Sequence, residues 1–186
     1  NTIDLARHAE RLGYSRYWLA EHHNTQSFVG SAPEIMIGAV ANATSHIDVG
    51  SAGVMLPHYS SLKVAELFRL LETLHPGRID LGIGRAPGSD QKTARALQPG
   101  PQAYGVEVFP QQIELLIQFL EDANGLAGEE GGFPADHPWR GIHATPRGPG
   151  MPELWMLGSG GDGSILAAQF GMAYCFAHFI NQDAGT

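Results

Sequence analysis

Apolar and polar positions follow two different periods along the chain, one typical of buried strands and one typical of amphipathic helices. Short apolar runs start near residues 17, 47, 79, 153 and 173. Between most of them lie segments whose apolar residues recur every three to four positions, as a helix with one buried face requires. Runs that alternate in this way predict a parallel sheet covered by helices.

The helical segments carry start and stop signals. Ser31 and Glu34 have the spacing of a capping box, and Pro33 falls in the first turn. Glycine or Pro-Gly follows the other segments, as is typical of helix ends. The predicted helical segments are 1–14, 31–45, 60–77, 109–125 and 163–171.

The spacing of the strands favours a closed barrel. The first two intervals, from 17 to 47 and from 47 to 79, are 30 and 32 residues long, close to the roughly 31 residues per unit of an eight-fold barrel of about 250 residues. The third interval contains an insertion at 125–150, which is read either as a mobile lid or as a long surface loop.

Polar groups gather where the predicted strands end. The strand ends read EHHN, LPHYS, GRAPGSD, GSGGDGS and HFIN. A (β/α)8 barrel has its site at the carboxyl ends of all its strands, whereas an open doubly wound sheet uses mainly one switch point. Five polar strand ends therefore favour an α/β fold of the (β/α)8, TIM-barrel type.

The sequence predicts fewer strands than the eight of such a barrel. Only about five are visible, and the chain opens on a helix without an initiator methionine. We therefore expect residues 1–186 to form a single, partial barrel domain that lacks strand 1 and the C-terminal units. The strand near residue 17 is then strand two.

Composition narrows the possible partners and the compartment. Eleven basic and 19 acidic residues give a net charge of −8 without a Lys/Arg cluster, which argues against nucleic acid and anionic membranes. No apolar run reaches the ~18 residues of a transmembrane helix. The single cysteine, Cys175, excludes a disulfide framework and favours a reducing compartment, the cytoplasm.

The histidines that end the first strand do not suggest a metal. His22 and His23 are neighbours in an extended run, so their side chains point to opposite faces. None of the nine histidines forms an H-x-H pair, so no metal site is predicted. His22 is then an acid–base group or simply a capped strand end, and for His23 the structural role is favoured.

A phosphate site is indicated further along the chain. The stretch LGSGGDGSILAAQFG is a strand, a glycine-rich turn and a helix, which together present backbone N–H groups to an anion. Arg85, just after a buried strand, suits phosphate as well. The alternatives are a tight βα loop and, for Arg85, a salt bridge to Asp90 or Glu21.

Small residues interrupt the second apolar run, in VGSAGVMLP. Ser51, Ala52 and Gly53 leave room for the close approach of a ligand or of another backbone. A flat ring system is one interpretation. A bulge or tight packing between strands is the other.

In this order and spacing, WLAEHHN, VGSAGVMLPHYS, LETLHPGRIDLGIGRAPG and LGSGGDGSILAAQFG resemble the luciferase-like monooxygenases. The resemblance implies a barrel enzyme that uses reduced FMN, supplied by a separate flavin reductase, and O2 to oxidise a small organic substrate. It also implies a homodimer through the helices that begin near Ser31 and Ser60.

The resemblance also assigns roles to residues. His22 falls on the family's active-site histidine, Ala52-Gly53 on its non-proline cis peptide and Arg85 on the arginine that meets the flavin phosphate. On the phosphate loop fall Ser159, Gly160, Gly161, Gly163 and Ser164. Possible substrate-side residues are Glu21, His58 and His178.

The chain departs from the family pattern in ways that leave alternatives open. Gly160 and Gly163 stand where relatives often have hydroxyl residues, and Gly84 stands at the luciferases' reactive cysteine. Two further alternatives are kept: the deazaflavin F420, which some relatives use, and a non-catalytic flavin-binding protein, which the short chain suggests. A phosphate-binding aldolase or isomerase would need a catalytic lysine, but Lys63 lies in a predicted helix and Lys92 in a predicted loop.

Overall fold

The computed structural model describes residues 1–27, 30–85, 90–97, 106–125 and 132–180. Within them the strands form one sheet in the order β1-β2-β4-β5-β6, with β3 also paired to β4, and all these pairings are parallel. The five predicted strands are confirmed, and the second run is split into β2 and β3. The strands are β1 (Arg16–Leu19), β2 (Asp48–Ser51), β3 (Val54–Met55), β4 (Ile79–Gly84), β5 (Glu153–Gly158) and β6 (Ala173–Phe176).

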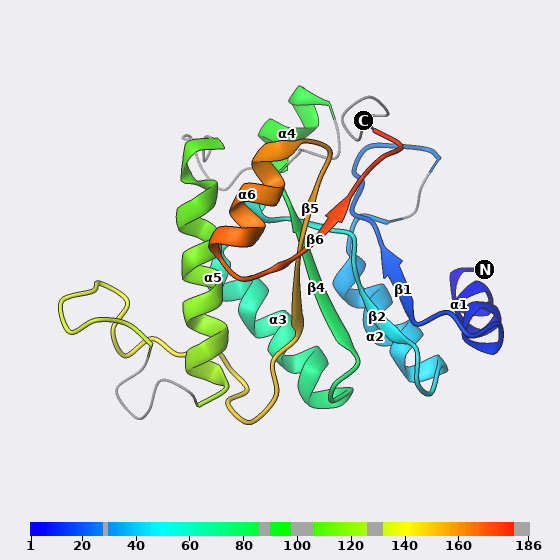
Figure 1. Cartoon of the computed structure of the whole chain (residues 1–186), viewed down its shortest axis with the longest axis horizontal. Coiled ribbons are helices and arrows are strands. Elements are labelled where there is room, and N and C mark those ends of the chain that lie inside the picture. The colour runs from blue at the N-terminus through cyan, green and yellow to red at the C-terminus, as the bar shows by residue number, and fades with distance from the viewer. Residues whose placement is uncertain (28–29, 86–89, 98–105, 126–131, 181–186) are drawn as a thin grey trace.

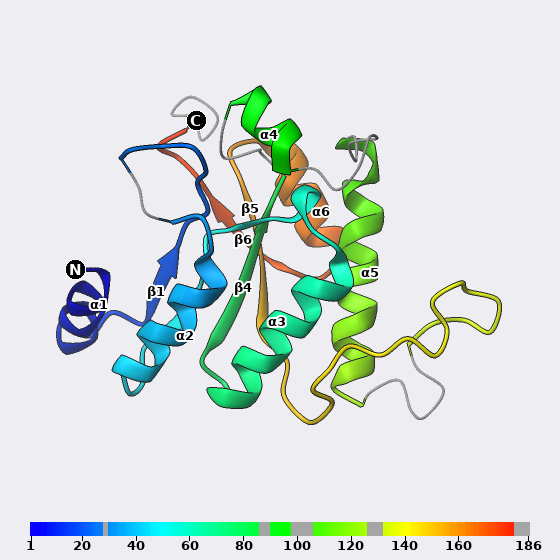
Figure 2. The ribbon, with the colours of Figure 1, turned by 180° about the vertical axis from the view of Figure 1, so that it is seen from behind.

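The sheet curls as half of a (β/α)8 barrel does, with helices on its outer side (Figures 1 and 2). Figure 2 shows α2 and α3 in front of the strands, and α5 and α6 pack against α3 and β5. The helices are α1 (Thr2–Arg11), α2 (Pro33–Ala43), α3 (Ser61–Leu74), α4 (Gln91–Leu97), α5 (Phe109–Ala123) and α6 (Gly161–Gln169), with short 3-10 turns η1 (Leu56–His58) and η2 (Val106–Val108). In the described part of the chain, no helix is both long and apolar enough to cross a membrane.

The start of α2 differs from the predicted capping box. Pro33 occupies the first helical position, so Ala32 becomes the N-cap, and no side chain caps the helix. Proline fixes the register in this way because its ring suits the first turn and needs no N–H partner. The prediction for Ser31 was therefore wrong, while Ser60 does cap α3 by accepting a bond from the amide of Lys63.

The core lies between the outer face of the sheet and its helices. Its largest fully buried apolar side chains include Ile37 of α2, Phe68 of α3, Leu81 of β4 and Leu116 of α5. Each such side chain contributes about 1.5–3 kcal/mol through burial. This core fixes the positions at which the strands end.

Glycines in the centre of the sheet are explained by neighbouring backbone. A Cβ at Gly53 would lie 2.8 Å from the carbonyl oxygen of Gly82, and one at Gly50 would meet the carbonyl oxygen of Asp80. Tight packing between strands, the second of the two interpretations, therefore accounts for Gly53. The peptide bond between Ala52 and Gly53 is cis, as expected.

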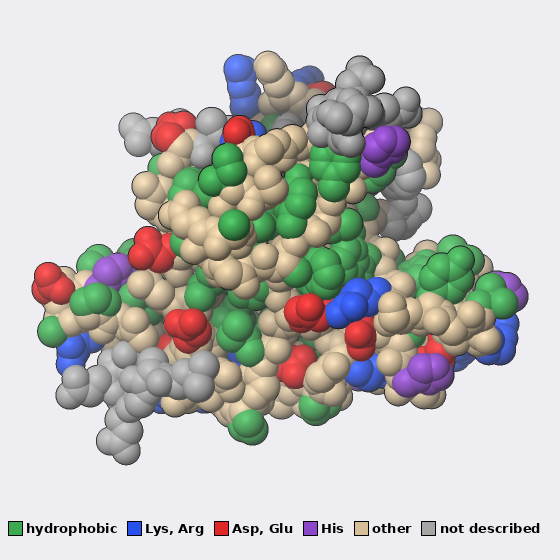
Figure 3. Space-filling view, in the orientation of Figure 1, with side chains coloured by type: hydrophobic (Ala, Val, Ile, Leu, Met, Phe, Trp, Pro, Cys, Tyr) green, Lys and Arg blue, Asp and Glu red, His purple; other side chains and the backbone are tan. Residues whose placement is uncertain are grey.

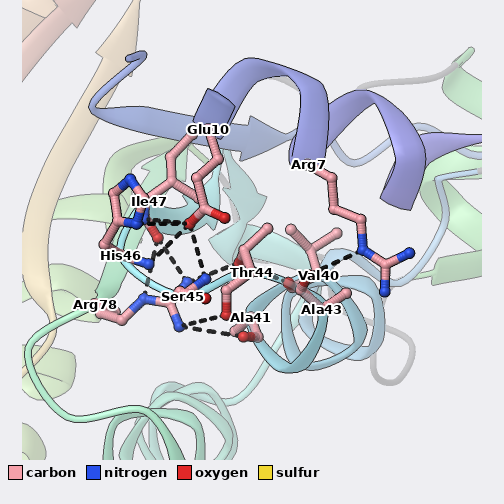
Figure 4. A network of polar contacts seen from close by, with 10 residues as sticks. All are labelled: Arg7, Glu10, Val40, Ala41, Ala43, Thr44, Ser45, His46, Ile47 and Arg78. Atoms are coloured by element: carbon pink, nitrogen blue, oxygen red, sulfur yellow. Dashed lines mark hydrogen bonds and ion pairs between the residues drawn. The ribbon is translucent and has the colours of Figure 1, made fainter. Parts of the chain in front are cut away.

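The amino ends of the strands are tied together by polar contacts, which Figure 4 shows beside β2. One oxygen of Glu10 accepts hydrogen bonds from the amides of Ser45, His46 and Ile47 at 2.8, 2.8 and 3.1 Å. The bond from His46 is the largest of the effects that lower the pKa of Glu10 to about 2. Arg78 donates to backbone oxygens of the same turn.

The described part of the insertion, residues 132–150, lies at the same end. Arg69 is fully buried and donates to the carbonyl oxygens of Pro146, Gly148 and Gly150. In Figures 1 and 2 this segment extends from the lower end of α5, far from α4. A surface loop describes it better than a lid over the carboxyl ends of the strands.

The inner face of the sheet carries a polar cluster near these amino ends. Asp80 accepts hydrogen bonds from Arg16 at 3.1 Å and from the Trp18 indole at 2.7 Å, and Arg16 also pairs with Glu153. Burial raises the pKa of Asp80 in spite of these donors. Figure 3 shows charged side chains below an apolar area on this side of the molecule.

Candidate functional site

The predicted site residues come from strands that all run in one direction, so their carboxyl ends share one edge of the sheet. This edge is the upper one in Figure 1, on the side of α4. His22 follows β1, Arg85 follows β4 and Ser159 follows β5. The sequence prediction that five strand ends meet at one edge is confirmed by this topology.

Glu21 is the most deeply buried ionisable group at this edge, with no exposed surface. Its Oε1 accepts hydrogen bonds from the hydroxyl of Tyr59 at 2.9 Å and from Nε2 of His23 at 2.7 Å, and its Oε2 accepts one from the amide of Met55 at 2.9 Å. We call these four residues the Glu21 cluster. Because a buried carboxylate is costly without partners, these donors are what keep it there.

The Glu21 cluster changes the acid–base properties of Tyr59. Burial raises the pKa of the phenol, and the nearby Glu21 carboxylate raises it further. Tyr59 is therefore a neutral hydrogen-bond donor at physiological pH. His23 is bound to Glu21, which agrees with the structural role expected for it.

His22 remains the candidate acid–base group at the end of β1. Its backbone N–H donates to the carbonyl oxygen of Gly30 at 2.9 Å, which fixes the backbone that carries the imidazole. The side chain is partly buried.

Arg85 lies beside the glycine-rich turn. Its guanidinium is 3.8 Å from the carboxylate of Asp162, in the first turn of α6. The expected alternatives for its partner were Asp90 and Glu21, but Asp90 instead bonds to Thr93 and Asn24. The structure thus brings Arg85 next to the turn for which the sequence predicted phosphate binding.

The amino end of α6 is open to a ligand. Its N-cap is Gly160, and no side chain caps the helix. A Cβ at Gly160 or Gly161 would meet no atom within 4 Å. The first amides of the helix and the guanidinium of Arg85 are therefore a donor set that fits a phosphate dianion.

The remaining residues of the turn are placed by local contacts. The hydroxyl of Ser164 donates to the carbonyl oxygen of Gly161 at 2.8 Å, so it must rotate before it can donate to a phosphate. Tyr174 donates to the carbonyl oxygen of Gly160 at 3.0 Å, and Cβ atoms at Gly158 and Gly163 would be within 3.2 Å of its side chain. A side chain at position 163 would therefore fit only if Tyr174 shifted by a few tenths of an ångström.

The two candidate substrate-side histidines differ in exposure. His58 ends η1 and is partly buried, and it directly precedes Tyr59 of the Glu21 cluster. His178 follows β6, is exposed, and contacts the ring of Phe176 edge-on at 6.2 Å.

Other features of the surface lie away from this edge. One hollow of about 360 Å³ is lined by α5 and by residues around Trp139. Another, of about 530 Å³, is lined by residues that include Glu153 and Phe170. No predicted site residue lines either hollow. Across the residues that the structure describes, no group of three His, Cys, Asp or Glu side chains could bind a metal ion.

Sequence reasoning missed three contributors: the Tyr59 hydroxyl, the Met55 amide and the Asp162 carboxylate. Tyr59 lies in the polar strand end LPHYS, so its position was a signal. The amide of Met55 gave no signal in the sequence, because every residue except proline has a backbone N–H. Asp162 lies within the glycine-rich turn, but its partner could not be known without the fold.

Comparisons with known proteins agree with this arrangement. A family model described as luciferase-like monooxygenase matches residues 1–185. The uncharacterized protein YwcH of Bacillus subtilis is 47% identical over 99% of this chain, which covers 52% of that protein. The N-acetyl-S-alkylcysteine monooxygenase of the same bacterium is 42% identical over 98% of this chain, which covers 52% of that enzyme. The chain thus spans about half the length of the curated relatives it matches.

Solved structures show the same fold. The apo form of MsnO8 has a TM-score of 0.83 at 41% identity and is matched over 97% of this chain and 50% of its own. Two others are 20% and 18% identical and show the fold alone. The first is a Pseudomonas putida type II Baeyer–Villiger monooxygenase in complex with FMN, with a TM-score of 0.68 over 93% of this chain and 50% of that one. The second is an F420-dependent secondary alcohol dehydrogenase, with a TM-score of 0.69 over 90% of this chain and 51% of that one.

Proposed function

The chain belongs to the luciferase-like monooxygenase family, and on that premise we propose that it binds reduced FMN and serves in the O2-dependent oxidation of a small organic substrate. The proposal places the flavin at the carboxyl edge of the sheet, within a (β/α)8 barrel. The phosphate lies at the amino end of α6, and the ring lies toward Ala52, Gly53 and His22.

The observation that carries the proposal is the position of Arg85. The exposed guanidinium, with 46% of the side chain accessible, stands 3.8 Å from Asp162 in the first turn of α6. An exposed ion pair at that distance is worth little. A phosphate that replaces water there would accept charge-assisted bonds from Arg85 and from the helix amides, so the same groups gain far more from a dianion.

The other residues of the proposal act around the ring. Bound reduced flavin supplies the electrons that activate O2. Ala52 and Gly53 give the ring a surface of small groups, and the neighbouring strands keep that surface rigid. A neutral imidazole accepts a proton at one nitrogen and donates one at the other near neutral pH, so His22 is the acid–base group. His58 and His178 border the substrate side.

Binding and turnover of the full-length protein test this function. We expect saturable binding of FMN, and enzyme-dependent formation of oxidised substrate from O2 and reduced FMN that falls at least 100-fold in His22→Ala, since general acid–base groups supply about 10²–10⁴-fold. The product is measured because free reduced FMN consumes O2 without any enzyme. F420 binding without FMN binding would transfer the proposal to a deazaflavin oxidoreductase, as the likeness to the F420 enzyme allows. Binding of FMN without turnover would indicate a non-catalytic flavin protein.

The proposal includes two partners. A separate flavin reductase supplies the reduced cofactor. A second copy of the chain packs on α2 and α3, which are in contact with each other and expose Ile35, Leu70 and Leu74 at 70%, 49% and 62%. Light scattering should give a dimer at micromolar concentration for the wild type and a monomer for Ile35→Glu. A monomeric wild type would contradict this part.

A further inference from the structure

The Glu21 cluster joins parts of the chain that are distant in sequence. Glu21 follows β1, Met55 ends β3, and Tyr59 follows η1. All three lie at the edge to which the proposed function assigns the flavin. The carboxylate reaches each of them directly, through the bonds at 2.9 Å to the Met55 amide and the Tyr59 hydroxyl.

Residues 52–55, which end at Met55 of the Glu21 cluster, form the segment that faces the flavin ring in the proposed function. The amide of Ala52 donates to the carbonyl oxygen of Leu19 at 2.7 Å, and Met55 pairs with Gly84 of β4. The bond from Met55 to Glu21 adds a second link between this segment and the end of β1. Residues 52–55 are therefore tied to β1 at both ends, once through backbone and once through the carboxylate.

The burial of a charged group at this position needs a reason. Glu21 has no exposed surface, and its bonds come from a histidine, a phenol and a backbone amide. Burying a carboxylate carries a desolvation penalty that is offset only if its lone pairs accept hydrogen bonds. A Val or Leu at this position would fill the same space at lower cost, but it would leave the Met55 amide and the Tyr59 hydroxyl without acceptors.

We infer that Glu21 is a positioning residue of the flavin site, a role that rests on the proposed function. It acts through Met55 and Tyr59, by fixing residues 52–55 against the end of β1. It also accepts a hydrogen bond from His23, whereas the proposed function gives the acid–base role to the neighbouring His22. Glu21 itself need not touch the cofactor.

The inference distinguishes between two substitutions. In Glu21→Gln the side-chain oxygen still accepts from the Met55 amide, and the NH2 group faces Tyr59 and His23. A phenol oxygen and a neutral imidazole nitrogen both can accept, so these partners can reverse their roles. Glu21→Ala removes every bond. We therefore expect Gln to preserve flavin binding and Ala to weaken it.

A matched control is available at the other end of the sheet. Glu72 of α3 is also buried, and its Oε1 accepts a hydrogen bond from the amide of Gly77 at 2.8 Å. Glu72→Ala removes a buried carboxylate as Glu21→Ala does, but far from the strand ends that form the site. Both variants are expected to lower the melting temperature. Only Glu21→Ala should weaken the binding of the flavin.

The first measurement is the dissociation constant for FMN, with the full-length protein at a temperature where each variant is folded. We expect a loss of fivefold or more in Glu21→Ala, and changes of less than threefold in Glu21→Gln and Glu72→Ala. A loss below fivefold in Glu21→Ala, or an equal loss in Glu72→Ala, would overturn the inference. Should Glu21→Ala not fold, Tyr59→Phe decides: a threefold or larger loss supports the role, and a smaller one overturns it.

A second measurement separates this inference from the proposed function. Amide hydrogen exchange without any ligand should become at least tenfold faster at residues 54–59 in Glu21→Ala, but not in Glu72→Ala. Unchanged exchange would overturn the role of Glu21 even if FMN binds. If the wild type binds neither FMN nor F420, the proposed function fails, while the exchange result still decides whether Glu21 fixes this segment.

Discussion

The two ends of the sheet use charged side chains in opposite ways. At the amino end, buried or partly buried arginines are surrounded by acceptors: Arg69 has three backbone carbonyls, and Arg16 has Asp80 and Glu153. At the carboxyl end, Arg85 is half exposed beside a helix that no side chain caps. Satisfied polar groups stabilise a fold, whereas groups that still have bonding capacity can bind a ligand.

This difference follows from the architecture of parallel α/β units. At the amino end, polar bonds fix the connections that lead into the strands, as Glu10 does for residues 45–47 and Arg69 does for the described part of the insertion. The loops at the other end follow the strands and are free to vary, so they carry function in barrels. The Glu21 cluster is the exception, because it places a fully satisfied buried charge at the binding end.

The largest effect on stability is expected at Arg69. Arg69→Met keeps the aliphatic stem but leaves the carbonyl oxygens of Pro146, Gly148 and Gly150 without their buried donor. We expect the free energy of unfolding to fall by about 3–5 kcal/mol. Urea denaturation measures this, with Arg11→Ala on the exposed side of α1 as a control that should change stability by less than about 0.5 kcal/mol. A change below about 1 kcal/mol in Arg69→Met would contradict the account of the amino end.

A smaller effect, with a defined pH dependence, is expected at Glu10. Glu10→Gln should cost about 1–2 kcal/mol at neutral pH, because a charged acceptor of three amides becomes neutral. The folded-state pKa is lowered from 4.5 to about 2, so the wild type has the full contribution above pH 4.5 and loses it as the pH falls toward 2. The difference between wild type and variant should shrink over that window. A constant difference from pH 6 to pH 2 would refute the role of the carboxylate.

Replacing Asp80 should change the free energy of unfolding less than the burial of its side chain suggests. Its pKa is raised because desolvation outweighs the bonds from Trp18 and Arg16. A raised pKa means that ionisation weakens the fold as the pH rises through that pKa. Asp80→Asn removes this penalty together with the charge, so the net change should stay within about 1 kcal/mol. Denaturation at pH 7 tests this, and a loss above about 3 kcal/mol would show that the ion pair with Arg16 dominates.

The smallest effect on stability belongs to Arg85, at the binding end. Arg85→Ala should change the free energy of unfolding by less than about 0.5 kcal/mol, because its ion pair with Asp162 is exposed. If the two ends of the sheet differ as described, Arg85→Ala must destabilise the protein far less than Arg69→Met. Thermal unfolding of the ligand-free protein measures it, and a drop comparable to that of Arg69→Met would erase the distinction.

Much of the fold could be predicted from the sequence because hydrophobic period and glycine punctuation act locally. The strands near residues 17, 47, 79, 153 and 173 are present, and Gly125 and Gly171 follow their helices with positive φ. The helix α4 was missed because Gln91–Leu97 is short and contributes no buried residue. The predicted cap at Ser31 failed because Pro33 fixed the start of α2 one residue later.

The site was harder to predict, because its parts meet only in the fold. The approach of Arg85 to the glycine-rich turn could be expected, but its neighbour Asp162 could not. The sequence leaves two interpretations of Ser51, Ala52 and Gly53 open, a surface for a ring and tight packing, and only the fold shows that the carbonyl of Gly82 leaves no space for a Cβ at Gly53. The roles of Ala52, His22, His58 and His178 stay predictions, since no measured contact with a ligand tests them.

The most direct test of the central claim compares FMN with riboflavin, which lacks the phosphate. Dissociation constants of both should be measured for the wild type and for Arg85→Ala. We expect the wild type to bind FMN at least tenfold more tightly than riboflavin, because charge-assisted bonds to the phosphate contribute about 1.5–3 kcal/mol. Arg85→Ala should abolish most of this preference while leaving riboflavin binding unchanged. Equal loss of affinity for both ligands, or an undiminished preference for FMN, would contradict a phosphate site built from Arg85 and the amino end of α6.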